Sequence, residues 1–343
     1  MNDQDRHGTV VVSSRCEFDL IVDVLEKHGA TNNDAQLQAT ILVEGDLRGQ
    51  HSHGLRRVPV LAKRLKNKVT ASGVEPVVSY AGSARAHVDG RHGLGPVVAK
   101  HAIDTLLVTA KSAGIAMVSV ANSGHVGMLA PYVERMADEG FIGLALTTSE
   151  ALVAPWGGTR AMVGTNPIGI GIPTEGAPLV VDMSTAAVSA GKILDYAARG
   201  QDIPLGWAVD NYGNQTTSSV EASQGAIAPF GGPKGYALGL AIEILVGLTT
   251  ASSLGREVHG TLDTDTFSTK GDLFIAIPSP ESPSILNGLT TYLEQLRSEG
   301  TEHGSVLIPG DRARKLREER MKDGIPLDKQ LWKQITDLAT IGE

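Results

Sequence analysis

Two histidines, a serine and an arginine lie close together near position 50. The segment contains His51-Ser52-His53-Gly54, and Arg57 follows four residues after His53. If the segment is helical, His53 and Arg57 share one face, because residues i and i+4 of a helix are neighbours. An imidazole, with an ordinary pKa of about 6.5, exchanges protons near neutral pH. A guanidinium matches both oxygens of a carboxylate.

This combination suits the reduction of a 2-oxo acid. One group has to hold the substrate carboxylate, and another has to protonate the oxyanion as a hydride reaches carbon. The residues therefore predict Arg57 as the carboxylate ligand and His53 as the proton-transfer group. Ser52 is expected to hydrogen-bond the imidazole or to cap the following helix. A nearby helix N-terminus would disfavour the imidazolium and lower the pKa of His53.

Other interpretations of these residues remain open. In the first of these, Ser52 is an ordinary N-cap residue and both histidines lie on the surface. Alternatively, His51, His53 and His125 join Asp46 in a zinc or manganese site, and the protein is a metal-dependent hydrolase. No further ligand spacing supports that site, and a lone His125 in a glycine-rich loop is more often structural than catalytic. A third alternative is a ligand-binding protein without catalysis.

The composition is that of a globular protein and restricts its partners. The chain has 343 residues, of which 41% are hydrophobic and 20% charged, enough for about two domains. A formal net charge of -8 disfavours a nucleic-acid partner. A single cysteine, Cys16, and a polar stretch over residues 1–9 predict a cytoplasmic protein. The longest apolar run, residues 237–248, is too short for a membrane span and contains Glu243.

Hydrophobic periodicity predicts helical ends around a central α/β segment. The expected helices cover residues 18–27, 33–47, 58–65, 95–113, 128–139, 186–199, 234–248, 285–297, 311–322 and 327–338. The expected strands cover residues 77–80, 84–88, 115–120, 141–146, 168–172, 179–181 and 273–277, and residues 213–224 are expected to form a loop.

Two expectations about organisation follow from these elements. Residues 115–146 indicate a βαβ-like unit with the loop 122–127 at the carboxyl end of its first strand, where α/β sheets tend to bind ligands. The domains are predicted as a helical part over residues 1–76, a central α/β part over 77–280 and a helical part over 281–343 that packs with the first. The general motifs G-x-G-x-x-G, G-x-x-x-x-G-K-[ST] and G-x-S-x-G are absent from the sequence and leave the chemistry open.

Many short motifs between residues 46 and 327 follow one another in a recognisable order. They include Asp46-Leu-Arg-Gly49, Ser52-His-Gly54, Asn122-Ser-Gly-His125, Gly164-Thr-Asn-Pro167, Asp182-Met-Ser-Thr185, Gly231-Gly-Pro-Lys-Gly235 and Pro309-Gly-Asp311. Each motif is weak alone, but together they resemble the malate/L-lactate dehydrogenase family, which is unrelated to the Rossmann-type lactate dehydrogenases. That family also holds ureidoglycolate, sulfolactate and diketogulonate oxidoreductases and cyclic imino acid reductases.

The resemblance implies an NAD(P)-dependent 2-hydroxyacid oxidoreductase. It implies NAD or NADP bound on a non-Rossmann α/β domain, a helical domain formed by both ends of the chain, and a homodimer. His53 would be the acid in reduction and the base in oxidation, Ser52 would assist it, and Arg57 and Thr165 would bind the substrate. The implied cofactor-binding residues are His125, Val126, Gly127, Met128, Leu129, Asp182, Met183, Ser184, Lys234, Gly235, Gly310 and Asp311.

Three positions depart from the family pattern or divide its members. Thr148 stands where relatives usually have Asn, and Asp272 follows Gly271 where relatives have Gly-His. Lys192, expected to bind substrate, stands where imino acid reductases carry an acidic helper for the histidine. The lysine resembles the hydroxy-acid members. It therefore favours a 2-hydroxy/2-oxo acid pair over the alternative, an NADPH-dependent reductase of a cyclic imino acid.

Overall fold

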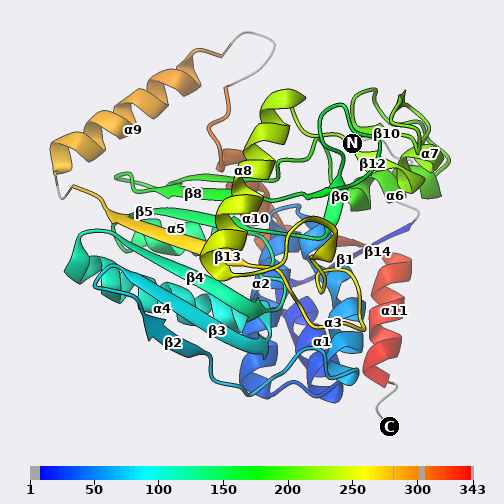
Figure 1. The fold of residues 1–343 in the computed structure, drawn as a ribbon, viewed down its shortest axis with the longest axis horizontal. Coiled ribbons are helices and arrows are strands. Elements are labelled where there is room, and N and C mark those ends of the chain that lie inside the picture. The colour runs from blue at the N-terminus through cyan, green and yellow to red at the C-terminus, as the bar shows by residue number, and fades with distance from the viewer. Residues whose placement is uncertain (1–7, 281, 301–305, 341–343) are drawn as a thin grey trace.

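A seven-stranded sheet forms the centre of the computed structural model, which describes residues 8–280, 282–300 and 306–340 (Figure 1). Its strand order is β2-β3-β4-β13-β5-β8-β9. The strands are β2 (Val77–Tyr80), β3 (Arg85–Gly93), β4 (Ala116–Ser123), β5 (Phe141–Thr147), β8 (Ile168–Ile172), β9 (Leu179–Met183) and β13 (Asp272–Pro278). Only β3 and β4 pair in parallel, joined by α4 (Gly95–Ala113), and the other neighbours are antiparallel.

The predicted βαβ-like unit is present in chain order but is interrupted in space. α5 (Ala130–Asp138) connects β4 to β5, yet β13 lies between these strands and is antiparallel to both. Asp272 at the start of β13 pairs with Val120 and Thr147, so it lies at the carboxyl ends of β4 and β5. The loop 122–127 therefore leaves the sheet beside the first residues of β13.

Alternate side chains of the central strands face two different helical layers. On β13, Phe274 and Ala276 join the core formed with α4 and α5, whereas Leu273 packs with α8 (Pro233–Thr250). In Figure 1, α8 crosses in front of the sheet and α4 and α5 lie behind it. The helix α5 sits directly on glycines of the sheet: a Cβ on Gly171 would lie 2.1 Å from the carbonyl oxygen of Val133.

The helices near the two ends of the described chain share one core. β1 (Thr9–Val12) pairs antiparallel with β14 (Ile325–Asp328). The core cluster around them contains Ile21 of α1 and Ile335 of α11. Its helices are α1 (Ser14–Lys27), α2 (Asn32–Leu47), α3 (Val58–Lys66) and α11 (Lys329–Thr340). The helix α10 (Asp311–Asp323) adds no residue to this cluster and contacts α2 through the ion pair of Arg317 with Glu44. The domain boundaries at residues 76 and 280 stay a prediction.

A smaller five-stranded sheet and a projecting helix complete the fold. The sheet contains β6 (Ala151–Val153), β7 (Val163–Gly164), β10 (Ala208–Val209), β11 (Gln215–Thr216) and β12 (Ala226–Ile227), flanked by α6 (Ala190–Ala198) and α7 (Ser219–Gln224). The prediction of a loop over residues 213–224 is wrong, because Ser218 caps α7 and Thr216 hydrogen-bonds Glu221 at 2.6 Å. α9 (Pro283–Ser298) projects from the body beyond β8 (Figure 1). No helix in the described ranges has the length and apolarity needed to cross a bilayer.

The contact between α5 and β8 predicts the effect of a single methyl group. Gly171→Ala is expected to lower the free energy of unfolding by about 1–3 kcal/mol, because the added Cβ overlaps the backbone of Val133. Urea unfolding measures this change. Gly176→Ala is the matched control in the turn after β8, since no atom lies within 4 Å of its added Cβ. Equal stabilities of the two variants would contradict this account of the packing.

Candidate active site

The segment that carries His53 and Arg57 consists of two short 3-10 helices. They are η2 (His51–His53) and η3 (Leu55–Arg57), and Gly54 separates them with φ −103° and ψ −141°. The expectation of one continuous helical face is therefore wrong. The charge of Arg57 nevertheless lowers the pKa of His53, which shows that the two side chains lie near each other. The chain bends at Gly54 against α2, where a Cβ would lie 1.9 Å from Asp46 Oδ2.

His53 is held as a neutral imidazole. Ser52 Oγ lies 3.0 Å from its Nδ1, so the predicted hydrogen bond is present. Burial, followed by the charge of Arg57, lowers the pKa of His53 to about 4. Burial and the charge of Arg57 therefore lower the pKa of His53, a shift that was predicted to come from a helix N-terminus. The ring of His125 lies 5.4 Å away between centroids, and burial and Arg57 also lower its pKa.

Arg57 is a buried cation with spare hydrogen-bonding capacity. Only 9% of the residue is exposed. One terminal nitrogen donates to the carbonyl oxygen of Thr261, but the buried Nε has no hydrogen-bond partner. Burial lowers the pKa of Arg57 to about 10, and the charge of Glu150 opposes that shift, so the group remains charged at neutral pH. A carboxylate is the natural acceptor for such a donor.

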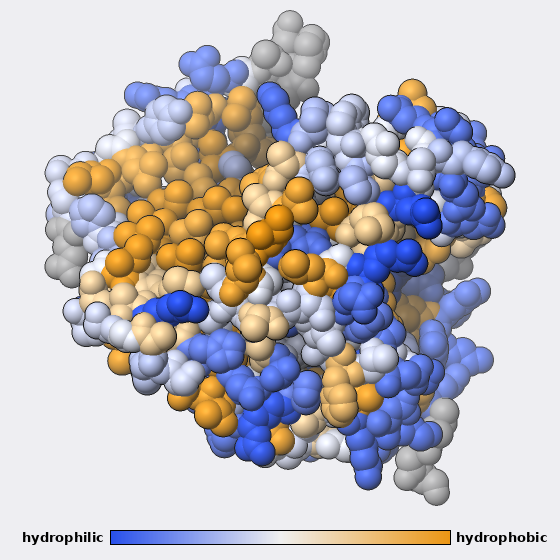
Figure 2. Space-filling model, in the orientation of Figure 1, coloured by the Kyte–Doolittle hydropathy of each residue, from blue (hydrophilic) through white to orange (hydrophobic). Residues whose placement is uncertain are grey.

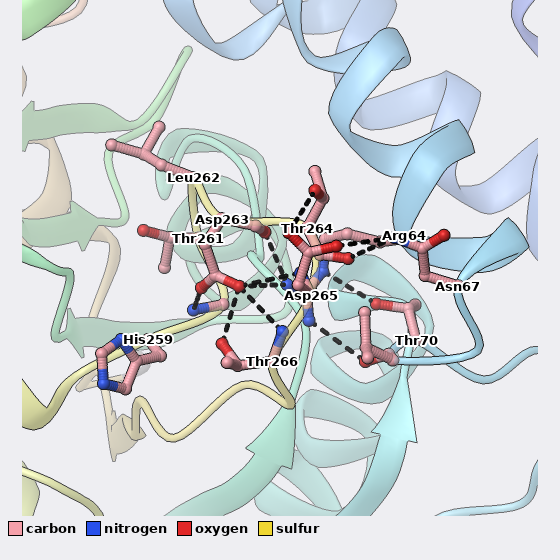
Figure 3. A network of polar contacts seen from close by, with 12 residues as sticks. Arg64, Asn67, Thr70, His259, Thr261, Leu262, Asp263, Thr264, Asp265 and Thr266 are labelled. Atoms are coloured by element: carbon pink, nitrogen blue, oxygen red, sulfur yellow. Dashed lines mark hydrogen bonds and ion pairs between the residues drawn. The ribbon is translucent and has the colours of Figure 1, made fainter.

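The loop over residues 259–266 fixes the carbonyl group that orients Arg57 (Figure 3). Asp263 accepts hydrogen bonds from the backbone N–H groups of Gly260 (2.6 Å) and Thr266 (2.9 Å). Arg64, itself 2% exposed, donates to the Asp263 carbonyl at 2.8 Å. Hydrogen bonds within the loop and from α3 therefore hold one face of the site rigid.

Glu150 ties this loop to the other side of the site. Its Oε1 accepts from the backbone N–H groups of Thr261 and Leu262, each at 2.9 Å. The preceding residue, Ser149, accepts from Thr165 N at 2.9 Å, and its hydroxyl lies 3.1 Å from Thr165 Oγ1. This chain of contacts links Thr165 to Arg57. The sequence analysis missed Glu150 and the 259–266 loop, for which turn-forming residues such as Asp263 were the available signal.

Several backbone N–H groups of the predicted cofactor loop already donate hydrogen bonds to side chains of the protein. His125 Nδ1 accepts from Gly127 N at 3.1 Å, and Asp182 accepts from Leu129 N and Ala130 N at 2.8 Å each. Burial raises the pKa of Asp182 despite these bonds. Among the described residues, the backbone N–H groups of His125, Val126 and Met128 have no acceptor, so these are the donors that this loop could offer to a phosphate or ribose.

The start of α8 fits an anionic group. The N-cap residue Gly232 provides no side-chain cap, and Gly231 has φ +57° with no atom within 4 Å of an added Cβ. Exposed Lys234 lies in the first turn, before buried Gly235. An uncapped helix N-terminus with a lysine suits a pyrophosphate. Phe230 N donates to Thr185 O at 3.0 Å, which brings the segment of Asp182, Met183 and Ser184 close to this helix.

Two other predicted site residues have partners within the protein, and their roles stay predictions. The Nζ of Lys192 lies 4.7 Å from the ring centroid of Trp207, and α6 approaches the 51–57 segment, since a Cβ on Gly191 would lie 3.9 Å from Ser52 Cβ. Asp311 pairs with Arg297 at 2.9 Å. Gly310 lies against β9, since an added Cβ would be 3.2 Å from Val180 O.

The residues proposed for a metal site do not converge. His51 Nδ1 donates to Asp46 Oδ1 at 2.5 Å, and its Nε2 lies 3.4 Å from Arg320 Nη1, a cation. Across the described ranges, no group of three or more His, Cys, Asp or Glu side chains is arranged to hold a metal ion. The cluster that the fold assembles is His53, Ser52, Arg57 and His125.

Comparison with known proteins finds relatives along nearly the whole chain. A family profile described as malate/L-lactate dehydrogenase matches residues 14–336. The malate/(S)-sulfolactate dehydrogenase of Methanothermus fervidus is 38% identical over 334 residues, covering 96% of this chain and 97% of that protein.

Solved structures with the same fold include two close matches. A dehydrogenase from Sinorhizobium meliloti is 43% identical with a TM-score of 0.91, covering 96% of this chain and 98% of that one. The sulfolactate dehydrogenase from Methanocaldococcus jannaschii is 36% identical with a TM-score of 0.91, covering 97% of both chains. Together with the ordered motifs and the cluster around His53, these matches show that the chain belongs to the malate/L-lactate dehydrogenase family.

Proposed function

We propose that this protein is an NAD(P)-dependent oxidoreductase that interconverts a small 2-hydroxy acid and the corresponding 2-oxo acid. The observation that carries the proposal is the buried Arg57, whose unpartnered Nε lies in the same cluster as the neutral imidazole of His53. The Arg57 guanidinium suits the substrate carboxylate, and the His53 imidazole suits the proton transfer. Relatives named as malate and sulfolactate dehydrogenases act on acids of this class.

Substrate binding and proton transfer are coupled through the charge on Arg57. In the free protein, burial and that charge hold the pKa of His53 at about 4. A carboxylate bound to Arg57 offsets the charge, so it raises the pKa of His53 and favours uptake of the proton that reduction consumes. In oxidation, neutral His53 accepts the proton from the hydroxyl group, and Ser52 keeps the ring oriented. A bound nicotinamide cofactor supplies or accepts the hydride.

The cofactor would lie between four segments of the chain. The N–H groups of Val126 and Met128 and the first turn of α8 at Lys234 would hold its phosphates. Met183 and Ser184 would line the ribose or nicotinamide, with Gly310 beside β9. Thr165 would contact the substrate through the network that reaches Arg57. Lys192 stands where cyclic imino acid reductases have an acidic residue that assists the histidine. Its amine cannot replace that acid, which favours a hydroxy acid as substrate.

The proposal includes a cytoplasmic homodimer. Beyond its first turn, the exposed face of α8 consists of apolar residues, with Leu245 45% and Leu248 77% exposed. Figure 2 shows a broad hydrophobic surface around this helix and the neighbouring strands. A contiguous apolar surface of this kind is typical of subunit contacts, and a second copy of the chain is the partner that the family resemblance implies. Cys16 is exposed and unpaired, as suits a reducing compartment.

Two substitutions separate the predicted roles of the catalytic pair. His53→Ala is expected to lower kcat about 100-fold or more, because a general acid–base group is lost. Arg57→Lys is expected mainly to raise KM for the oxo acid, because a point charge cannot form the paired N–H contacts of a guanidinium. Steady-state kinetics with a panel of short 2-oxo acids and NADH or NADPH measures both effects. Wild-type-like kcat in His53→Ala would contradict the proposed function.

The pH dependence of oxidation reports on His53. The base must be neutral, so kcat/KM is expected to stay level from about pH 8 to about pH 5 and to fall only toward about pH 4. Arg57→Gln removes the neighbouring charge and should move this acid limb to higher pH. A wild-type limb centred at the ordinary value of about 6.5 would contradict the burial argument.

Negative charges introduced on α8 by substitution test the subunit contact. Leu245→Glu combined with Leu248→Glu is expected to convert a dimer into a monomer in analytical ultracentrifugation, because the charges would be buried without partners. Val108→Glu on α4 is the matched control, since Val108 is 69% exposed on the other helical layer. A monomeric wild-type protein would rule out the dimer.

A further inference from the structure

Glu17 is an acidic residue buried behind the catalytic loop. It lies in the first turn of α1, has 0% exposure, and neither of its carboxylate oxygens has a hydrogen-bond donor among the described residues. An ionised carboxylate in such a place is costly. The Glu17 carboxyl group lies within hydrogen-bonding reach of the Asp46 side chain. Burial, then the charge of Asp46 and this hydrogen bond, raise the pKa of Glu17 to about 10. The site therefore favours a protonated carboxyl group.

Asp46 connects this buried acid to both halves of the catalytic loop. It lies near the end of α2 and is 1% exposed. Its Oδ1 accepts from His51 Nδ1 at 2.5 Å, and its Oδ2 accepts from Leu55 N at 2.6 Å. His51 begins η2 and Leu55 begins η3, so the two hydrogen bonds to Asp46 hold the loop on either side of His53.

Two glycines allow the loop to lie directly on α2. A Cβ on Gly45 would lie 2.7 Å from the carbonyl oxygen of His53, and one on Gly54 would lie 1.9 Å from Asp46 Oδ2. The backbone of His53 therefore follows the position of α2 and Asp46 closely. A shift in the Asp46 carboxylate would move the imidazole.

The charges around Glu17 balance only when it is neutral. Arg320 of α10 donates to the backbone carbonyl of Asp46 and lies 3.4 Å from His51 Nε2. The charge of Arg320 lowers the pKa of Glu17, whereas Asp46 and Cys16 raise it. The cation Arg320 therefore already faces the anions Asp46 and Glu319. Ionisation of Glu17 would add a second buried anion without a donor.

We propose that Glu17 and Asp46 form a buried acid pair that retains one proton and positions the catalytic loop. The Glu17 carboxyl group donates the retained proton to the Asp46 carboxylate, which in turn holds His51 and Leu55. Both are positioning residues, since they act on the site through the loop. The statement that the loop is catalytic rests on the proposed function, whereas the retained proton does not.

The retained proton is tested by folding equilibria. In wild type, Glu17 keeps its proton when folded and releases it when unfolded, because its folded pKa lies above its unfolded value. Stability is therefore lost as pH rises. The ratio of the unfolding constants of wild type and Glu17→Gln is expected to rise about tenfold per unit between about pH 5 and about pH 9. Glu26→Gln, at an exposed position of α1, should give a flat ratio. A flat ratio for Glu17→Gln would overturn the proposal.

Infrared spectroscopy provides a second readout in the wild-type protein. A carbonyl band of a protonated carboxylic acid is expected at about pH 8. The band should be lost in Glu17→Gln and in Glu17→Met, a second variant of similar size that removes the ionisable group. Absence of the band from wild type, or its persistence in the substituted proteins, would contradict a protonated Glu17.

Positioning is tested by the contrast between two variants. Glu17→Ala is expected to lower kcat roughly tenfold or more through displacement of His53, with KM for the oxo acid little changed. Glu17→Gln, which keeps a donor toward Asp46, should restore kcat and retain it at alkaline pH. Equal kcat in the alanine variant and wild type would remove the positioning role. If His53→Ala were harmless, the proposed function would fail while the folding and infrared results still stood.

Discussion

The burial of the Arg57 guanidinium is the constraint on which the rest of the site depends. A buried cation without a carboxylate bonded to it has to be supported by neutral acceptors and by more distant charge. The carbonyl of Thr261 supplies the first, and Glu150 the second. Burial, reinforced by the same positive charge, keeps His53 neutral. Anion binding and the proton affinity of His53 therefore both depend on this buried charge.

Three segments far apart in the chain supply the walls around this charge. The loop at 51–57 rests on α2, the loop at 259–266 is held by hydrogen bonds to Asp263 and from Arg64, and Ser149 and Glu150 join them to Thr165. The central sheet brings the last two segments together, because β13 follows the 259–266 loop and pairs with β5, which precedes Ser149. Precise placement of a few polar groups on a rigid scaffold is what an acid–base site requires.

Periodicity was enough to predict the long helices and most central strands, since their apolar faces are local patterns. It could not place β13 within the sheet or pair β1 with β14, because such pairings join residues far apart in sequence. Residue chemistry predicted that His53, Ser52 and Arg57 lie together, and the structure clusters them, although the helical spacing argument for them was wrong. Glu150 and Asp263 were missed because their roles arise only from contacts made across the fold. Lys192 was placed by resemblance alone, and the contact of its amine with the Trp207 ring could not be predicted from the sequence, because it arises only in the fold.

The pairing of β1 with β14 has a consequence for how the protein is made. Residues 9–12 are translated well before their partners at 325–328, because the whole central sheet lies between them in the chain. The core that supports η2 therefore has high contact order and closes only after both the central sheet and β14 have been translated. A nascent chain that folds its central sheet early would still lack the support on which the 51–57 segment rests.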